Sequence, residues 1–94
     1  MNAQELTLNI AVNLGRIGRW ACENRRNRIE QFLEETENYI EQLEQVSKSP
    51  RFQQTFNIFK DNFIRLKNDV RSDPEWAEMM FTWADILAHR AKLA

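Results

Sequence analysis

The chain has one histidine, His89, and Asp85 precedes it by four residues. This spacing puts both side chains on one face of a helix, where a carboxylate can orient an imidazole that acts as a general base. A hydrolase or transferase also needs a nucleophile, a second carboxylate or a metal, and no serine, cysteine or second histidine lies nearby in the sequence. The pair fits an exposed ion pair at the C-terminal end of a helix better, because a protonated imidazole is favoured there. We therefore expect no enzymatic activity and no catalytic residue.

Ligands for a metal or a cofactor are sparse. Cys22 and His89 are the only cysteine and histidine, whereas structural zinc takes about four ligands. Glutamates are frequent between residues 30 and 44, but bundles that bind two metals through glutamates also carry a Glu-x-x-His element, which is absent. Gly15 and Gly18 lack the Lys-Ser/Thr of a phosphate-binding loop and the third glycine of a dinucleotide site. The sequence predicts no metal site and no cofactor.

The composition is that of one folded domain, residues 1–94, with 43% hydrophobic and 29% charged residues. Two glycines and two prolines are too few for a β-protein rich in tight turns, so helices are favoured. No segment approaches the roughly 18 apolar residues that cross a bilayer, and polar residues interrupt the N-terminal segment that could act as a signal peptide. The single cysteine fits a reducing compartment. We expect a cytoplasmic protein with no membrane contact.

The second half of the chain contains two clear helix starts. Two dipeptides combine an N-cap residue with a proline at the first helical position: Ser49-Pro50 and Asp73-Pro74. They predict helices over residues 50–71 and 74–92. Apolar residues recur at helical spacing in the first of these, at Phe52, Phe56, Phe59, Phe63, Leu66 and Val70. The second has the same kind of seam, at Trp76, Met80, Trp83 and Leu87.

The first half is less uniform. Residues 29–46 predict a helix with one apolar side and one side rich in glutamate. Residues 6–14 alternate between apolar and polar types, which is typical of a strand, but a helix also aligns Leu6, Ile10, Leu14, Ile17 and Ala21. We prefer the helix, because no second strand is visible and a lone strand leaves its backbone groups unpaired.

Six polar residues, 23–28, separate these two segments. If they form a loop, four helices of similar length suit an antiparallel four-helix bundle. If they are helical, residues 4–46 form one long helix and the bundle has three helices. Both alternatives are all-α, and we favour the loop.

Basic residues gather in two places. Five arginines surround the first connection, Arg16, Arg19, Arg25, Arg26 and Arg28, and three basic residues follow one edge of the helix 50–71, Lys60, Lys67 and Arg71. Such clusters neutralise phosphates in nucleic-acid-binding proteins. They also complement the acidic helix 29–46, so opposite charges favour antiparallel pairing of these two helices. Our alternative hypothesis is a small accessory subunit of a nucleic-acid-processing complex, whose arginine cluster contacts phosphates.

Several apolar side chains fall outside the core seams. On a helix, Leu8 and Val12 point away from Leu6 and Ile10, and Phe81 lies nearly opposite Trp83. A helix that is apolar on two faces has to be buried on both. A ridge of small residues on the first helix would let another backbone approach closely: Ala11, Gly15, Gly18 and Cys22. We expect a non-enzymatic interaction module that binds itself, as a homodimer or larger oligomer, and another protein. The expected interface comprises Leu8, Ala11, Val12, Gly15, Gly18 and Phe81.

Overall fold

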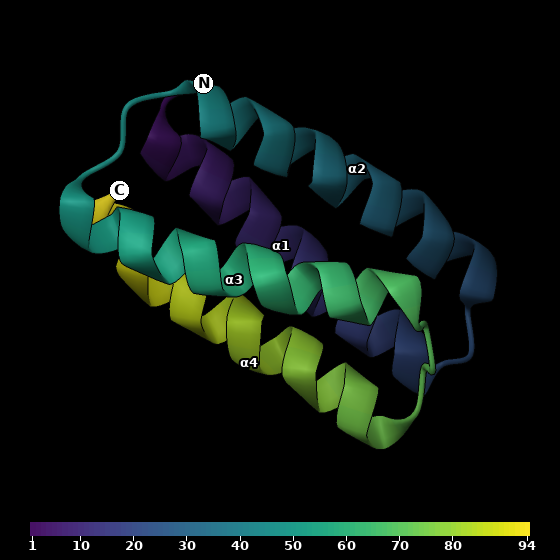
Figure 1. The fold of residues 1–94 in the computed structure, drawn as a ribbon. Helices are drawn as coiled ribbons and strands as arrows, with labels where there is room; N and C mark the ends of the chain where they lie inside the picture. The colour runs from purple at the N-terminus through teal and green to yellow at the C-terminus, as the bar shows by residue number, and fades with distance from the viewer.

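Four helices of similar length follow one another in the computed structural model, which describes all 94 residues. They are α1 (Ala3–Cys22), α2 (Arg26–Gln45), α3 (Pro50–Asn68) and α4 (Pro74–Arg90), and a short 3-10 turn, η1 (Ala91–Leu93), ends the fold. The helices run alternately up and down, so both termini lie at the same end of the bundle (Figure 1). There is no strand, and the fold is an all-α bundle of four helices, as the sequence predicts.

Side-chain caps fix the starts of three helices. The Ser49 hydroxyl accepts a hydrogen bond from the backbone N–H of Phe52 (3.1 Å), and the Asp73 carboxylate accepts one from Trp76 (2.8 Å). Both predicted caps are therefore confirmed, each with a proline at the start of its helix. Asn2 caps α1 in the same way, and the sequence reasoning missed it.

The segment between α1 and α2 is a tight turn. Asn24 has φ 57°, in the left-handed region, and the N–H of Arg25 bonds the carbonyl of Trp20 at 2.9 Å. The Asn24 N–H bonds the carbonyl of Ala21, which completes a Schellman motif, the usual way to end a helix with a left-handed residue. This turn excludes the single long helix over residues 4–46.

The helices differ from the predicted ranges mainly at their ends. Residues 26–28 belong to α2 and not to the loop, because the first turn of a helix needs no apolar residue. Helix α3 ends at Asn68, before the predicted 71, since the chain must turn there to reach the Asp73 cap. Helix α4 ends at Arg90 and continues as the 3-10 turn.

The first segment is helical, and the strand alternative is wrong. The apolar stripe predicted for a helix is buried along its whole length, at Leu6, Ile10, Leu14, Ile17 and Ala21. Thr7 also enters the interior, where its hydroxyl donates to the carbonyl of Ala3 at 2.7 Å. Asn13 is buried as well, and its Nδ2 finds no acceptor.

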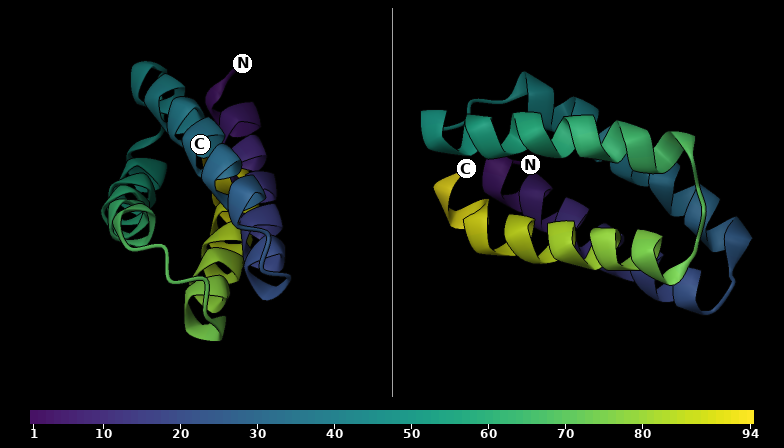
Figure 2. Two further views of the ribbon diagram at one scale, coloured as in Figure 1. Left: turned by 90° about the vertical axis from the view of Figure 1, so that its right-hand side faces the viewer. Right: turned by 60° about the horizontal axis from the view of Figure 1, so that its bottom comes forward.

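The core lies between the helices, and each of the four contributes buried side chains to it. Helix α1 packs closely on α2 and α4, whereas α3 stands further from its neighbours and reaches the core through its phenylalanines. Figure 2 shows α3 and α1 on opposite sides of the bundle. The rings of Phe59 and Trp83 join α3 to α4 at 5.5 Å, and the Trp76 indole donates to the carbonyl of Leu66 at 3.1 Å. Long aromatic side chains thus fill the space that the backbone of α3 leaves open.

Candidate interaction surface

Three of the side chains predicted at an interface are exposed. Leu8 is 41% exposed, Val12 51% and Phe81 43%, although all are large and apolar. The chain does not fold its own helices over them. The expected surplus of apolar surface is therefore present at these positions.

The two predicted faces meet in one place. Leu8, Val12 and Phe81 line a single shallow groove of ≈ 480 Å³ between α1 and α4. We call its lining the apolar patch: Leu8, Ala11, Val12, Phe81, Ala84 and Ala88, with Asp85 as its only charged member.

The ridge of small residues on α1 is buried at two positions and open at the other two. Ala11 and Gly18 are buried, and a Cβ added to Gly18 would come within 2.8 Å of the Phe81 ring. Nothing lies within 4 Å of a Cβ placed on Gly15, which is half-buried, and Cys22 is exposed. Gly18 therefore belongs to the contact of α1 with α4 inside the chain, where Phe81 packs against it, and not to a surface that another backbone could approach.

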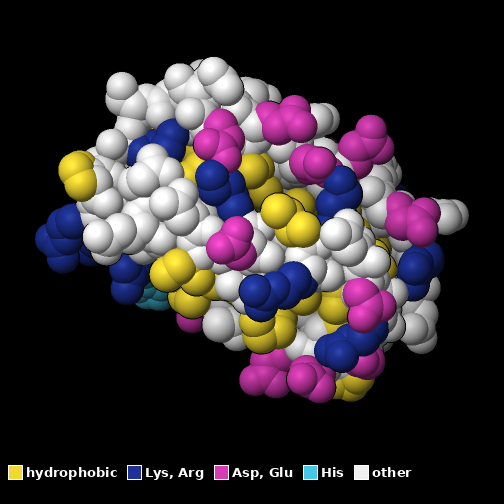
Figure 3. All heavy atoms as spheres, viewed as in Figure 1, with side chains coloured by type: hydrophobic (Ala, Val, Ile, Leu, Met, Phe, Trp, Pro, Cys, Tyr) yellow, Lys and Arg dark blue, Asp and Glu magenta, His cyan; other side chains and the backbone are white.

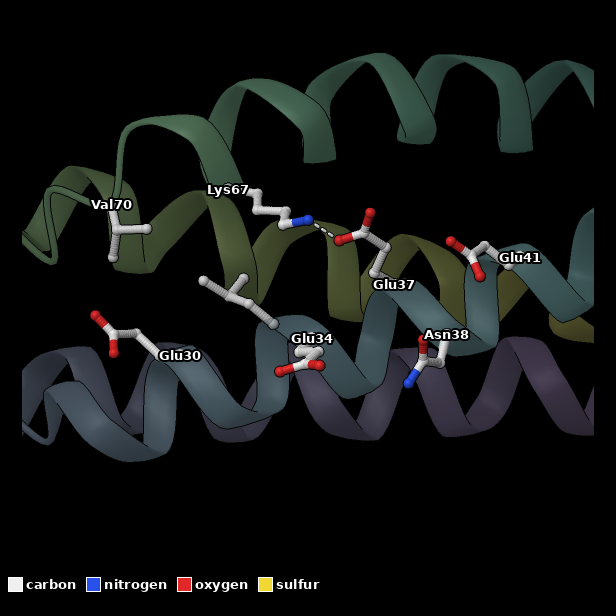
Figure 4. Close-up of a pocket in the computed structure, with 8 residues that line it drawn as sticks. Glu30, Glu34, Glu37, Asn38, Glu41, Lys67 and Val70 are labelled. Atoms are coloured by element: carbon white, nitrogen blue, oxygen red, sulfur yellow. Dashed lines mark ion pairs between the residues drawn. The ribbon is translucent and has the colours of Figure 1, made fainter.

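A second hollow lies between α2 and α3, and the sequence reasoning did not predict it. Its volume is ≈ 580 Å³, and Figure 4 shows a row of α2 side chains along it, Glu30, Glu34, Glu37, Asn38 and Glu41. Lys67 reaches across from α3 and pairs with Glu37, and Lys60 pairs with Glu44 at 2.5 Å. These ion pairs confirm the predicted attraction between the acidic and basic helices. Figure 3 shows apolar side chains in the middle of this face, among acidic and basic ones.

The five arginines do not form one uniform cluster. Arg16 lies over the ring of Phe32 (5.9 Å) and Arg28 over that of Trp20 (5.8 Å). Arg25 pairs with Glu23 at 3.0 Å, and Arg26 pairs with Glu30 at 3.4 Å and also donates to the Val70 carbonyl at 3.0 Å. Arg25, Arg26 and Arg28 line a hollow at the turn between α1 and α2, and Arg19 makes no ion pair.

Asp85 and His89 lie on one face of α4, as the spacing indicates. The nearest carboxylate oxygen is 4.0 Å from Nδ1, and both side chains are about four-fifths exposed. The Nδ1 atom also lies 2.8 Å from the backbone oxygen of Asp85. No group of three or more His, Cys, Asp or Glu side chains is arranged to hold a metal ion. No helix is both long and apolar enough to cross a membrane.

Comparison of the chain with protein-family models, curated proteins and solved structures found no match.

Proposed function

We propose that this chain is a protein–protein interaction module that associates with itself through the apolar patch. One observation supports the proposal above others: three large apolar side chains from two helices stay exposed and meet in one groove. Isolated exposed apolar residues are common on monomers, but a contiguous group from two elements is typical of an interface.

Burial of this patch would stabilise a complex. Each large apolar side chain contributes about 1.5–3 kcal/mol when it is fully removed from water. Leu8, Val12 and Phe81 are already about half-buried, so each would contribute only part of that value. A contact of standard size covers about 800 Å² per partner. It would therefore extend beyond the groove onto the polar side chains around it.

Sedimentation velocity over a range of protein concentrations tests the proposal. The wild-type chain is expected to shift from one copy to two as concentration rises. Val12→Glu places a charge in the patch, and Phe81→Glu does the same from α4, so both variants should remain single copies with unchanged helical circular dichroism.

Ile58→Glu is the matched control. Ile58 is 56% exposed on α3, close to the value for Val12, and it lies outside the patch. This variant should associate like the wild type. Association that persists in both Val12→Glu and Phe81→Glu would contradict the proposal.

A second candidate function is contact with phosphates. The hollow at the turn between α1 and α2 has a volume of ≈ 430 Å³ and is lined only by Asn24, Arg25, Arg26, Asn27 and Arg28. Fluorescence anisotropy with a labelled single-stranded oligonucleotide would test it. Binding through these arginines should weaken steeply as salt rises and should fall in Arg28→Ala, whereas association through an apolar patch should persist in salt.

A further inference from the structure

Four charged side chains stand around the apolar patch, two on each side of the groove. Helix α1 carries Glu5 and Arg19, each seven residues from Val12, and seven residues bring a helical side chain back to almost the same face. On the other side, Glu78 and Lys92 are each seven residues from Asp85. All four are exposed, and none makes an ion pair within the chain.

The signs of these charges alternate around the patch. Helices α1 and α4 are antiparallel, and η1 packs on α1, so Glu5 and Lys92 lie at the end of the bundle that holds both termini. Arg19 and Glu78 lie toward the other end, where Gly18 of α1 meets Phe81 of α4. Each helix therefore presents one acidic and one basic residue, in opposite order along the bundle.

Such a pattern is complementary to its own copy. When two identical patches face each other across a two-fold axis that runs along or across the helices, each corner meets a corner of the opposite sign. A patch bordered by charges of a single sign would repel a second copy and favour a different partner. This pattern identifies a second copy of the chain as the occupant of the patch.

Two orientations of the two-fold axis pair each of the four charges with an opposite charge of the second copy. Asp85 distinguishes between these orientations. An axis perpendicular to the helices pairs Glu5 with Arg19 and Glu78 with Lys92 of the second copy. Asp85 is midway between Glu78 and Lys92, so it would then face the second copy's Asp85, a repulsive contact. An axis parallel to the helices avoids this contact and pairs Glu5 with Lys92 and Arg19 with Glu78.

The parallel axis also matches side-chain sizes. It sets α1 of each copy against α4 of the other. With Glu5 opposite Lys92 and Arg19 opposite Glu78, the spacing along the two helices sets Leu8 against Ala88 of the second copy. Val12 then lies against Ala84 and Asp85 of the second copy, and all of these residues line the groove. Large side chains against small ones allow two surfaces to interdigitate.

We propose that two copies associate through the apolar patch about an axis parallel to the helices, with Glu5 paired to Lys92 and Arg19 to Glu78 across the interface. This inference rests on the proposed self-association and specifies its geometry.

Charge reversal with rescue tests the geometry. Sedimentation equilibrium at low ionic strength would compare the wild type with Glu5→Lys, Lys92→Glu and the double variant Glu5→Lys/Lys92→Glu. Each single variant turns two symmetry-related attractions into repulsions, so the dissociation constant should rise by about tenfold. The double variant restores opposite charges and should return to within about threefold of the wild type. Any cost to the first turn of α1 remains in the double variant and cannot produce this rescue.

Two further variants complete the experiment. Glu34→Lys makes the same change in net charge on α2, outside the patch, and should associate like the wild type. Glu5→Lys/Arg19→Glu restores attraction only if the axis is perpendicular to the helices, so it should associate less tightly than Glu5→Lys alone.

The outcomes separate this inference from the function on which it rests. A wild type that stays a single copy at every concentration overturns both. Association that Val12→Glu abolishes but Glu5→Lys leaves intact overturns the charge pairing and keeps the proposed function. Rescue by Glu5→Lys/Arg19→Glu overturns the parallel axis.

Discussion

At Gly18 the absence of a side chain determines how Phe81 sits between α1 and α4. The Phe81 ring occupies the space where a Cβ would be, at 2.8 Å from its ideal position. Gly15 is only three residues earlier, on the same ridge, and no atom approaches the corresponding point. Close packing against Phe81 therefore requires a glycine at position 18 but not at position 15, although the spacing of the two glycines suggests one common role.

Gly15→Ala and Gly18→Ala should change stability in different ways. Alanine in the middle of a helix is favoured over glycine by about 1 kcal/mol, so Gly15→Ala should raise the free energy of unfolding by about that amount. Gly18→Ala gains the same helix propensity but must displace the Phe81 ring, so it should be about 1–2 kcal/mol less stable than Gly15→Ala. Urea unfolding followed by circular dichroism in dilute solution would measure both. Equal stabilisation of the two variants would show that Phe81 yields at no cost.

At the scale of the elements, the left-handed residue Asn24 separates α1 from α2, so that they form two helices and not one. Asn24 ends α1 and lets the chain reverse within three residues, from Glu23 to Arg25, before α2 begins. Asparagine tolerates this conformation better than most residues, and glycine tolerates it best.

Asn24→Ala should therefore destabilise the fold, and Asn24→Gly should not. Alanine in the left-handed region costs about 1 kcal/mol or more. Glycine removes that strain. The free energy of unfolding of Asn24→Gly should therefore lie between the wild-type value and about 1 kcal/mol above it. Thermal unfolding of the three proteins would rank them. A stable Asn24→Ala with higher helix content would indicate that α1 and α2 can join into one helix.

The sequence predicts which face of each helix is buried better than how the helices fit together. Periodicity identifies the buried stripe from Leu6 to Ala21, and the two proline-marked caps are where the sequence puts them. It does not predict that Phe81 of α4 lies on Gly18 of α1. That contact depends on the register between two helices that are far apart in the chain. Neither the apolar periodicity nor the cap motifs specify this register. For the same reason, two separate candidate faces become one groove only in the folded chain.

At the scale of the whole molecule, charge is used in two different ways. Between α2 and α3, Lys60 and Lys67 pair with glutamates inside the chain and link the two helices that stand apart. Around the apolar patch, four exposed charged residues have no ion-pair partner within the chain, Glu5, Arg19, Glu78 and Lys92. Ion pairs within the chain thus cross the α2–α3 face, whereas the apolar patch and the four charged residues around it are exposed to solvent.

Self-association should therefore appear as concentration-dependent stability. A second copy that binds only the folded chain stabilises it by mass action, so the unfolding midpoint should rise by about 3–5 °C for each tenfold increase in concentration above the dissociation constant. Differential scanning calorimetry over about two decades of concentration would measure this slope. Val12→Glu should abolish the slope, because it removes association, while Ile58→Glu should keep it. A wild-type midpoint that is constant over this range would mean that the exposed Leu8, Val12 and Phe81 are not covered by a second copy.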